Sequence, residues 1–219
     1  MKCEKGHMLL YAVTDRAWAG RQSLYEQVES ALRGGVTCLQ LREKALDEAA
    51  FFKEAEEIGS LCRQYGVPFL VNDNLPVAIA SGADGVHIGQ SDLGVREARA
   101  LLGSGKILGV SAQTVEQAQR AVQEGADYLG VGAVFPTATK TDASPVPLPT
   151  LQAICQAVEV PVVAIGGIGR ENLLSLSGSG VQGVALVSAI FGARDITSAC
   201  RELRALAEQM AGNTPSERN

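Results

Sequence analysis

Three polar side chains alternate with leucines in the segment Leu39-Gln40-Leu41-Arg42-Glu43-Lys44. Because successive side chains of a strand point to opposite faces, Gln40, Arg42 and Lys44 share one face and the two leucines share the other. If the leucines pack under helices, an amide, a guanidinium and an ammonium group project together from the opposite face. Two cations on one face repel each other unless an anion lies between them, so the pattern favours an anion site. A solvated strand end is the alternative.

Two aspartates follow the next two apolar runs, in Val71-Asn72-Asp73-Asn74 and in Val86-His87-Ile88-Gly89-Gln90-Ser91-Asp92. If these runs form neighbouring parallel strands, Asp73 and Asp92 can approach the same ion. Magnesium prefers one or two carboxylates together with water and phosphate oxygens, so the pair predicts a magnesium-diphosphate site beside the cations. Taken singly, Asp73 is typical of an N-cap for a helix that opens at Leu75-Pro76, and Asp92 of a loop or capping residue.

Two further polar residues lie within apolar runs. His87 points into the protein interior by the same alternation, and a hydrogen-bonded core histidine is favoured there over a catalytic one. Ser111, near the end of the run Ile107–Ala112, either hydrogen-bonds a substrate or caps the next helix.

Later segments offer a second place for an anion. The run that begins at Tyr128 is followed by Phe135-Pro136-Thr137-Ala138-Thr139-Lys140, in a loop that continues to Pro149. Long loops in compact domains are commonly functional lids, and a polar loop without a ligand is the alternative. The backbone amides of Gly166-Gly167 and Val187-Ser188, after the last two runs, can cradle a phosphate.

Eight apolar runs must position these residues. They are Leu9–Asp15, Thr37–Lys44, Pro68–Asp73, Gly85–Gly89, Ile107–Ala112, Tyr128–Phe135, Pro161–Gly167 and Gly183–Ile190. Helical stretches separate them, and strands that alternate with helices pair in parallel through right-handed crossovers. The pattern predicts an α/β fold, a single (β/α)8 TIM barrel with its chemistry at the carboxyl ends of the strands. The alternative, an open doubly wound sheet, usually carries a Gly-rich loop after the first strand, where this chain has Thr14-Asp15-Arg16-Ala17.

The intervening stretches have the spacing and end signals of helices. Apolar residues recur every three to four positions at Leu24, Val28, Ala31 and Leu32, and Asp47 and Gly66 are placed as the N-cap and the terminator of the next helix. Four helix ends resemble one another, and each leads into one of the runs: Gly34-Gly35-Val36, Gly82-Ala83-Asp84, Gly125-Ala126-Asp127 and Gly180-Val181-Gln182. No linker interrupts the pattern, so residues 1–211 are expected to form one catalytic barrel domain and residues 212–219 a polar C-terminal tail.

Composition excludes several functional classes. A net charge of −5 argues against a nucleic-acid partner, and no stretch suggests a membrane span or a secretory signal. The five scattered cysteines and two histidines argue against a zinc site and against disulfides. We expect a cytoplasmic enzyme that acts on small molecules, and the sequence leaves homo-oligomerisation open.

The ordered set of segments resembles the thiamine-phosphate synthase family, also called thiamine-phosphate pyrophosphorylase. The resemblance spans about Leu10 to Phe191 and rests on Gln40–Lys44, Val71-Asn72-Asp73, His87–Asp92, Val110-Ser111-Ala112, Pro136–Lys140, Ile165–Ile168 and Val187–Ile190. It implies a magnesium-dependent transferase of the thiamine-phosphate diphosphorylase type, in thiamine biosynthesis. Such an enzyme couples 4-amino-2-methyl-5-hydroxymethylpyrimidine diphosphate to a thiazole phosphate, or its carboxylated form, and releases pyrophosphate.

The resemblance also implies residue roles. The pyrimidine diphosphate would be bound by Gln40, Leu41, Arg42, Glu43 and Lys44, with Asn72 and Ser111 near its ring and Mg²⁺ on Asp73 and Asp92. The thiazole phosphate would be bound by Thr137, Ala138, Thr139, Lys140, Gly167, Val187 and Ser188. Arg42, Lys44, Ser111 and Lys140 would take part directly in catalysis.

Two rival functions remain at this stage. One is a related barrel that acts on thiazole phosphate alone, as a thiazole tautomerase or a regulatory relative, and such relatives tend to lack the cationic and metal-binding set. The other is a non-catalytic phosphate sensor, which would need only the last two strand ends. The sequence departs from the family at Gln113, where many members carry histidine.

Overall fold

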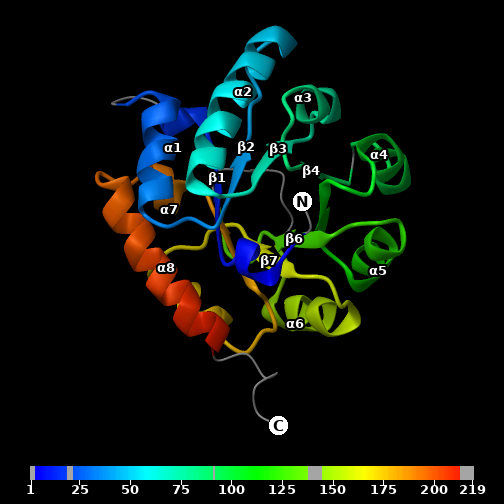
Figure 1. Ribbon diagram of the computed structural model, residues 1–219. Coiled ribbons are helices and arrows are strands. Elements are labelled where there is room, and N and C mark those ends of the chain that lie inside the picture. Colours follow the sequence, from blue (N-terminus) through cyan, green and yellow to red (C-terminus); the bar gives the residue numbers. More distant parts are fainter. Residues whose placement is uncertain (1–2, 19–21, 91, 138–144, 213–219) are drawn as a thin grey trace.

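Eight parallel strands close into a barrel in the order β1 to β8, with helices around the outside (Figure 1). The computed structural model describes residues 3–18, 22–90, 92–137 and 145–212. The strands are β1 (Leu10–Val13), β2 (Cys38–Leu41), β3 (Phe69–Asn72), β4 (Gly85–Ile88), β5 (Ile107–Ala112), β6 (Tyr128–Gly132), β7 (Val162–Ile165) and β8 (Gly183–Leu186). All eight expected runs therefore contain a strand, and the predicted (β/α)8 barrel is confirmed.

Most observed strands are shorter than the runs, because several runs included polar residues that lie in the loops beyond the carboxyl ends. The helices are α1 (Leu24–Arg33), α2 (Glu48–Tyr65), α3 (Leu75–Ala80), α4 (Val95–Leu102), α5 (Val115–Gln123), α6 (Leu148–Ala157), α7 (Ser188–Phe191) and α8 (Ile196–Gly212). Three short 3₁₀ turns, η1 (Lys5–Met8), η2 (Arg16–Trp18) and η3 (Leu173–Leu176), complete the described elements, and η3 stands where a helix was expected between β7 and β8.

The expected apolar face of the first helix and the expected end residues of the second are confirmed. The side chain of Asp47 accepts a hydrogen bond from the backbone N–H of Ala50, as an N-cap does. Gly66 ends α2 with φ of 67°, a left-handed conformation that glycine adopts without a Cβ penalty. In α1 the expected apolar face is buried, and Ser23 and Glu26 add a reciprocal capping box.

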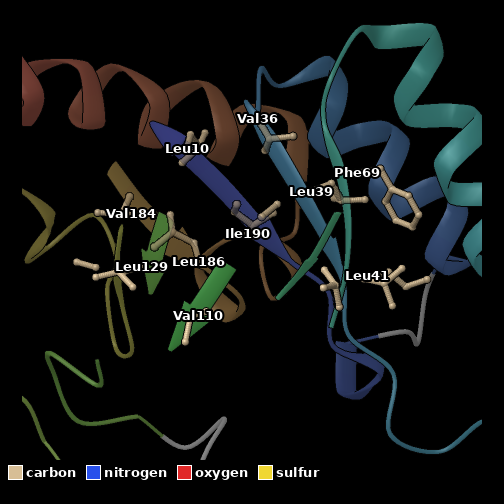
Figure 2. Close-up of a cluster of buried hydrophobic side chains, with 14 of the residues drawn as sticks. Leu10, Val36, Leu39, Leu41, Phe69, Val110, Leu129, Val184, Leu186 and Ile190 are labelled. Carbon is tan, nitrogen blue, oxygen red and sulfur yellow. The ribbon is translucent and has the colours of Figure 1, made fainter. Parts of the chain in front are cut away.

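Two concentric hydrophobic layers follow from the alternation of side chains along each strand. The outer layer lies between the strands and the helices, and Figure 2 shows members such as Leu39, Leu41 and Leu129. The inner layer fills the barrel with residues such as Tyr11, Leu70 and Tyr128. Leu39 and Leu41 are fully buried in the outer layer. The strand parity predicted for β2 is therefore correct, and it turns Gln40 inwards.

The amino end of the barrel repeats one contact at every second strand. The residue just before an even-numbered strand accepts a hydrogen bond, through its side chain, from a backbone N–H near the start of the preceding odd-numbered strand. The pairs are Thr37 with Leu10, Asp84 with Phe69, Asp127 with Leu108 and Gln182 with Val162, at 2.7 to 3.0 Å. These residues follow or end the four similar segments seen in the sequence. None of the described helices is both long and apolar enough to cross a bilayer.

Candidate active site

The cations at the end of β2 are held at the carboxyl-end mouth of the barrel by contacts with neighbouring loops. The buried Thr14 hydroxyl accepts the backbone N–H of Arg42 at 2.9 Å. The guanidinium of Arg42 lies 3.5 Å from a carboxylate oxygen of Asp15, and the ammonium group of Lys44 lies 2.5 Å from Asp73 Oδ2. The two cations thus each have a protein carboxylate beside them, so their coexistence does not by itself require a bound anion, contrary to the argument from repulsion.

Glu43 and Leu41 do not face the mouth. Leu41 lies in the outer hydrophobic layer, and the Glu43 carboxylate accepts the backbone N–H groups of Lys44 and Ala45 at 2.8 and 2.9 Å and pairs with Arg16. Burial acts to raise the pKa of Glu43, but the hydrogen bonds from Ala45, Arg16 and Lys44 outweigh it and lower the pKa overall. The side chains of both residues contact the protein itself, and binding of the substrate by Leu41 and Glu43 stays a prediction from the sequence. Glu43 holds the turn that carries Lys44.

The carboxylates expected to hold a metal come from adjacent loops. Asp73 follows β3 with φ of 60°, an uncommon left-handed conformation for a residue with a side chain, and its backbone N–H donates to the backbone carbonyl oxygen of His87. Asp73 is not the N-cap of α3, because Asn74 has that role. Asp92 Oδ2 accepts the backbone N–H of Gly89 at 2.6 Å, which fixes the loop after β4.

The two aspartates are a small ligand set. Among the described residues, no three His, Cys, Asp or Glu side chains gather as a metal site. Magnesium does not need three, because it is commonly bound through one or two carboxylates with substrate phosphates and water. The chemistry of Asp73 and Asp92 therefore fits a magnesium ion that arrives with a phosphorylated substrate.

A chain of hydrogen bonds crosses the barrel interior beneath the mouth. Gln40 Nε2 donates to the Tyr11 hydroxyl at 2.6 Å, and the hydroxyls of Tyr11 and Tyr128 lie 2.8 Å apart. The Tyr128 hydroxyl lies 2.8 Å from His87 Nδ1, and His87 Nε2 lies 3.0 Å from Ser111 Oγ. The chain joins five strands, β2, β1, β6, β4 and β5. His87 is thus interior and hydrogen-bonded, as predicted.

Burial explains the protonation of the two tyrosines. Their side chains are enclosed in the barrel, and loss of hydration raises the pKa of Tyr11 and of Tyr128 well above the usual value for tyrosine. Both phenols therefore stay neutral and can each donate one hydrogen bond.

Ser111 on β5 and Asn72 on β3 lie on either side of β4, near the carboxyl ends of the strands. Ser111 does not cap α5, since Thr114 accepts the N–H of Gln117 in that role. This removes the structural alternative for Ser111, whose hydroxyl contacts the imidazole instead. Asn72 ends β3 and pairs in register with His87 on β4. Gln113, the residue that departs from the family, donates to the carbonyl oxygen of Gly132 at 3.2 Å.

The ends of β7 and β8 supply mostly backbone. Gly167 is exposed with φ of 64°, and a Cβ on it would lie 2.3 Å from the carbonyl oxygen of Pro136. The two glycines expected to admit a phosphate are therefore also required by close packing, since Gly166 lies equally tightly against Ala133. After β8, Ser188 is exposed and Val187 partly buried.

The loop after β6 is described only in part. Thr137 is partly buried at its start, and Ala138, Thr139 and Lys140 lie outside the described residues. The expected phosphate contacts of these three residues stay predictions from the sequence.

Sequence reasoning missed Tyr11, Tyr128 and Thr14. The two tyrosines carried a usable signal, because strand parity turns both inwards in the same way as His87 and Gln40. Their partners could not be found, because the contact between them joins residues 117 positions apart. Thr14 entered the sequence argument only because its segment lacks the glycines of a Gly-rich loop, and its contact with Arg42 was not predicted.

Comparison with known proteins agrees with this geometry. The family described as thiamine monophosphate synthase matches residues 10–190. A thiamine-phosphate synthase from Ruminiclostridium cellulolyticum is 47% identical, with 89% of this chain and 92% of the relative covered. One from Chloroflexus aurantiacus is 48% identical, with coverage of 90% and 91%.

A solved structure of a family member is also similar to this chain in its fold. Thiamine phosphate pyrophosphorylase from Pyrococcus furiosus is 37% identical and superposes with a TM-score of 0.87, covering 94% of this chain and 98% of that chain. With a barrel of this kind, a polar mouth in the expected order and relatives of this similarity, the chain belongs to the thiamine-phosphate synthase family.

Proposed function

We propose that this protein couples 4-amino-2-methyl-5-hydroxymethylpyrimidine diphosphate to a thiazole phosphate, giving thiamine phosphate and pyrophosphate. The observation that carries the proposal is the arrangement at the end of β2, where Arg42 and Lys44 stand at the mouth beside carboxylates from two neighbouring loops. A diphosphate with its magnesium ion is the ligand that uses both the cations and the carboxylates of such a mouth.

Residue roles follow from position. Arg42 and Lys44, together with Lys140, would bind the diphosphate, and Gln40, Asn72 and Ser111 would contact the pyrimidine. The thiazole phosphate would be bound by backbone and hydroxyl groups after β6, β7 and β8, namely Thr137, Ala138, Thr139, Gly167, Val187 and Ser188. Two anion subsites on opposite sides of one mouth suit a reaction that joins two phosphorylated molecules.

Asp73 and Asp92 would hold the magnesium ion through oxygen ligands. When bound, the ion would supply positive charge next to the diphosphate oxygens that become the leaving group. Asp73 lies beside Lys44, so binding of the ion and the diphosphate would exchange that contact for one to the substrate. Asp92 is kept in place by the N–H of Gly89, which occupies only one of its two carboxylate oxygens.

The chemistry asks for charge stabilisation and alignment rather than a strong base. The bond between the pyrimidine methylene carbon and the diphosphate oxygen breaks, and its electron pair leaves with the diphosphate. The electron-rich aminopyrimidine can support the resulting cation, and the thiazole nitrogen then supplies the pair that forms the new carbon–nitrogen bond. Arg42, Lys44 and Lys140 would stabilise the departing charge, while the second subsite holds the thiazole in line.

One assay tests the proposal. Purified protein is given both substrates, with and without magnesium, and the release of pyrophosphate is followed. We expect release only when both substrates and magnesium are present. Release that ignores the thiazole phosphate, or no release at all, contradicts the proposal; conversion of thiazole phosphate alone would favour the tautomerase alternative.

A further inference from the structure

Each group in the hydrogen-bond chain beneath the mouth donates to the next one, and the first donor is Gln40. An amide nitrogen only donates, so the Tyr11 oxygen is the acceptor in the 2.6 Å contact with Gln40 Nε2. The single hydroxyl proton of Tyr11 then points at its other neighbour, the Tyr128 oxygen, 2.8 Å away. The proton of Tyr128 is directed in turn to His87 Nδ1.

The imidazole passes the direction on to Ser111. A neutral histidine whose Nδ1 accepts a hydrogen bond carries its proton on Nε2. That proton is directed to Ser111 Oγ, 3.0 Å away. The serine oxygen is then occupied as an acceptor, and its own proton is left to point elsewhere. Among the described residues, the imidazole is the side chain that hydrogen-bonds the Ser111 hydroxyl.

We propose that Tyr11, Tyr128 and His87 are positioning residues, which fix the imidazole as the Nε2–H tautomer and so turn the Ser111 hydroxyl towards the substrate as a hydrogen-bond donor. The opposite direction would have a different result. The Ser111 proton would then be committed to His87, and the serine would offer a ligand only its lone pairs. The order of donors and acceptors in the buried chain thus decides whether Ser111 offers a ligand a proton or only lone pairs.

The surrounding strands are shaped to hold this chain. A Cβ on Gly109 would lie 2.2 Å from a ring atom of Tyr128, so only glycine leaves space for that ring. A Cβ on Gly130 would lie 3.0 Å from His87 Cε1. The rings of Tyr11 and Tyr128 also pack edge to face, with centroids 5.9 Å apart. The two tyrosines are almost completely buried, which shields their hydroxyls from bulk water.

This direction has a consequence for substrate choice, which rests on the proposed function. A donor at Ser111 matches a heteroaromatic ring with an acceptor nitrogen, as the aminopyrimidine has. A ring that presents an N–H at that position would oppose one donor with another, and a site that hydrogen-bonds its ligand rejects such analogues. We infer that the chain contributes to the selection of the pyrimidine.

The direction can be measured without any substrate. The chain has two histidines, so [15N]histidine labelling with a His7→Gln variant assigns both imidazoles. Two-bond proton–nitrogen correlation at mildly alkaline pH then reports the tautomer of His87. We expect the Nε2–H tautomer, with Nδ1 unprotonated. A predominant Nδ1–H tautomer would overturn the proposal, whether or not the protein proves to be a synthase.

A matched pair of variants tests the positioning role. Tyr128→Phe keeps the ring and removes the hydroxyl that donates to His87, so we expect mixed tautomers. We also expect kcat/KM for the pyrimidine diphosphate to fall about tenfold, with the KM for the thiazole phosphate unchanged. Tyr11→Phe removes the donor that directs the Tyr128 proton but keeps the Tyr128 hydroxyl beside His87, so we expect a smaller shift in the tautomer and a fall in kcat/KM of only about two- to threefold.

The outcomes separate positioning from packing. Equal losses in the two variants with an unchanged tautomer would indicate packing alone and overturn the proposal. If Tyr128→Phe fails to fold, Gly130→Ala replaces it, because the added Cβ presses on the imidazole while every hydroxyl stays. We expect that variant to fold with a weaker contact to Ser111 and a lower kcat/KM for the pyrimidine diphosphate. A wild-type rate in Gly130→Ala would count against the role of His87.

Discussion

The two ends of this barrel use polar side chains in opposite ways. At the amino end, Thr37, Asp84, Asp127 and Gln182 repeat one contact at every second strand. At the carboxyl end the described residues show no repeated arrangement: β2 is followed by cations, β3 by Asp73, and β7 by glycines, while β5 carries Ser111. Repetition around a barrel meets a need that every strand has, whereas residues that differ from strand to strand meet the needs of a ligand.

The repeated need is the backbone at the start of the strands. A buried N–H without an acceptor is costly, and the repeated side chains supply an acceptor for one strand in each pair. At the carboxyl end, a ligand could replace contacts between protein side chains, such as the ion pair of Lys44 with Asp73. Substitutions at the two ends should therefore separate stability from activity.

The largest expected effect is on activity, at the carboxyl end. Asp92→Asn keeps an acceptor for the Gly89 N–H but loses the charge, and Lys140→Ala removes a cation. We expect turnover to fall roughly 100-fold in each, because each removes charge that would stabilise the leaving group. The melting temperature of both should stay within about 2 °C of wild type. Steady-state kinetics in saturating magnesium together with calorimetry check this; near wild-type rates would contradict these roles.

The next effect is on stability, at the amino end. Asp127→Ala leaves the N–H of the buried Leu108 without its side-chain acceptor and breaks the ion pair with Arg99. We expect unfolding to cost about 2 kcal/mol less, with a melting temperature lower by about 4–8 °C and an unchanged kcat. Asp127→Asn, which keeps an acceptor oxygen, is the matched control and should lose less. A large fall in kcat for folded protein would show that the two ends are not separable.

A smaller effect sharpens the comparison, since Glu43 lies near the mouth but acts structurally. Glu43→Gln weakens its contacts with Arg16 and with the N–H groups of Lys44 and Ala45, so we expect a loss of about 1–2 kcal/mol near pH 7. The folded pKa of Glu43 is lowered, so its contribution is present above the unfolded pKa and is lost as the pH falls through the folded pKa. Urea unfolding at about pH 7 and about pH 3 should show the difference between the two proteins shrink in acid. A difference independent of pH would contradict the charged role of Glu43.

Sequence patterns predicted the parts of the fold that depend on local order. The alternation in β2 correctly placed Leu39 and Leu41 in the outer layer, and Asp47 and Gly66 marked the ends of α2. The structure excludes the capping role that was the alternative for Asp73, and Glu43 lies where the alternation implies. Asn74 caps α3 in place of Asp73, because a cap depends on the backbone angles of one residue and both neighbours have suitable side chains. The alternation puts Glu43 opposite Arg42 and Lys44, but it does not show that Arg16 and two backbone N–H groups are its partners there.

The sequence by itself determined the eight strands, the faces of the β2 side chains and the end of the barrel at which the polar residues gather. These follow from periodicity and end signals within about 20 residues of chain. Only the tertiary structure decided which polar groups are partners. The chain from Gln40 through Tyr11, Tyr128 and His87 to Ser111 joins five strands, and its links arise when closure of the barrel brings distant inward side chains together. Local sequence patterns cannot predict such contacts. Each inward-facing residue could contact many other inward-facing residues, and its actual partner depends on how the barrel closes.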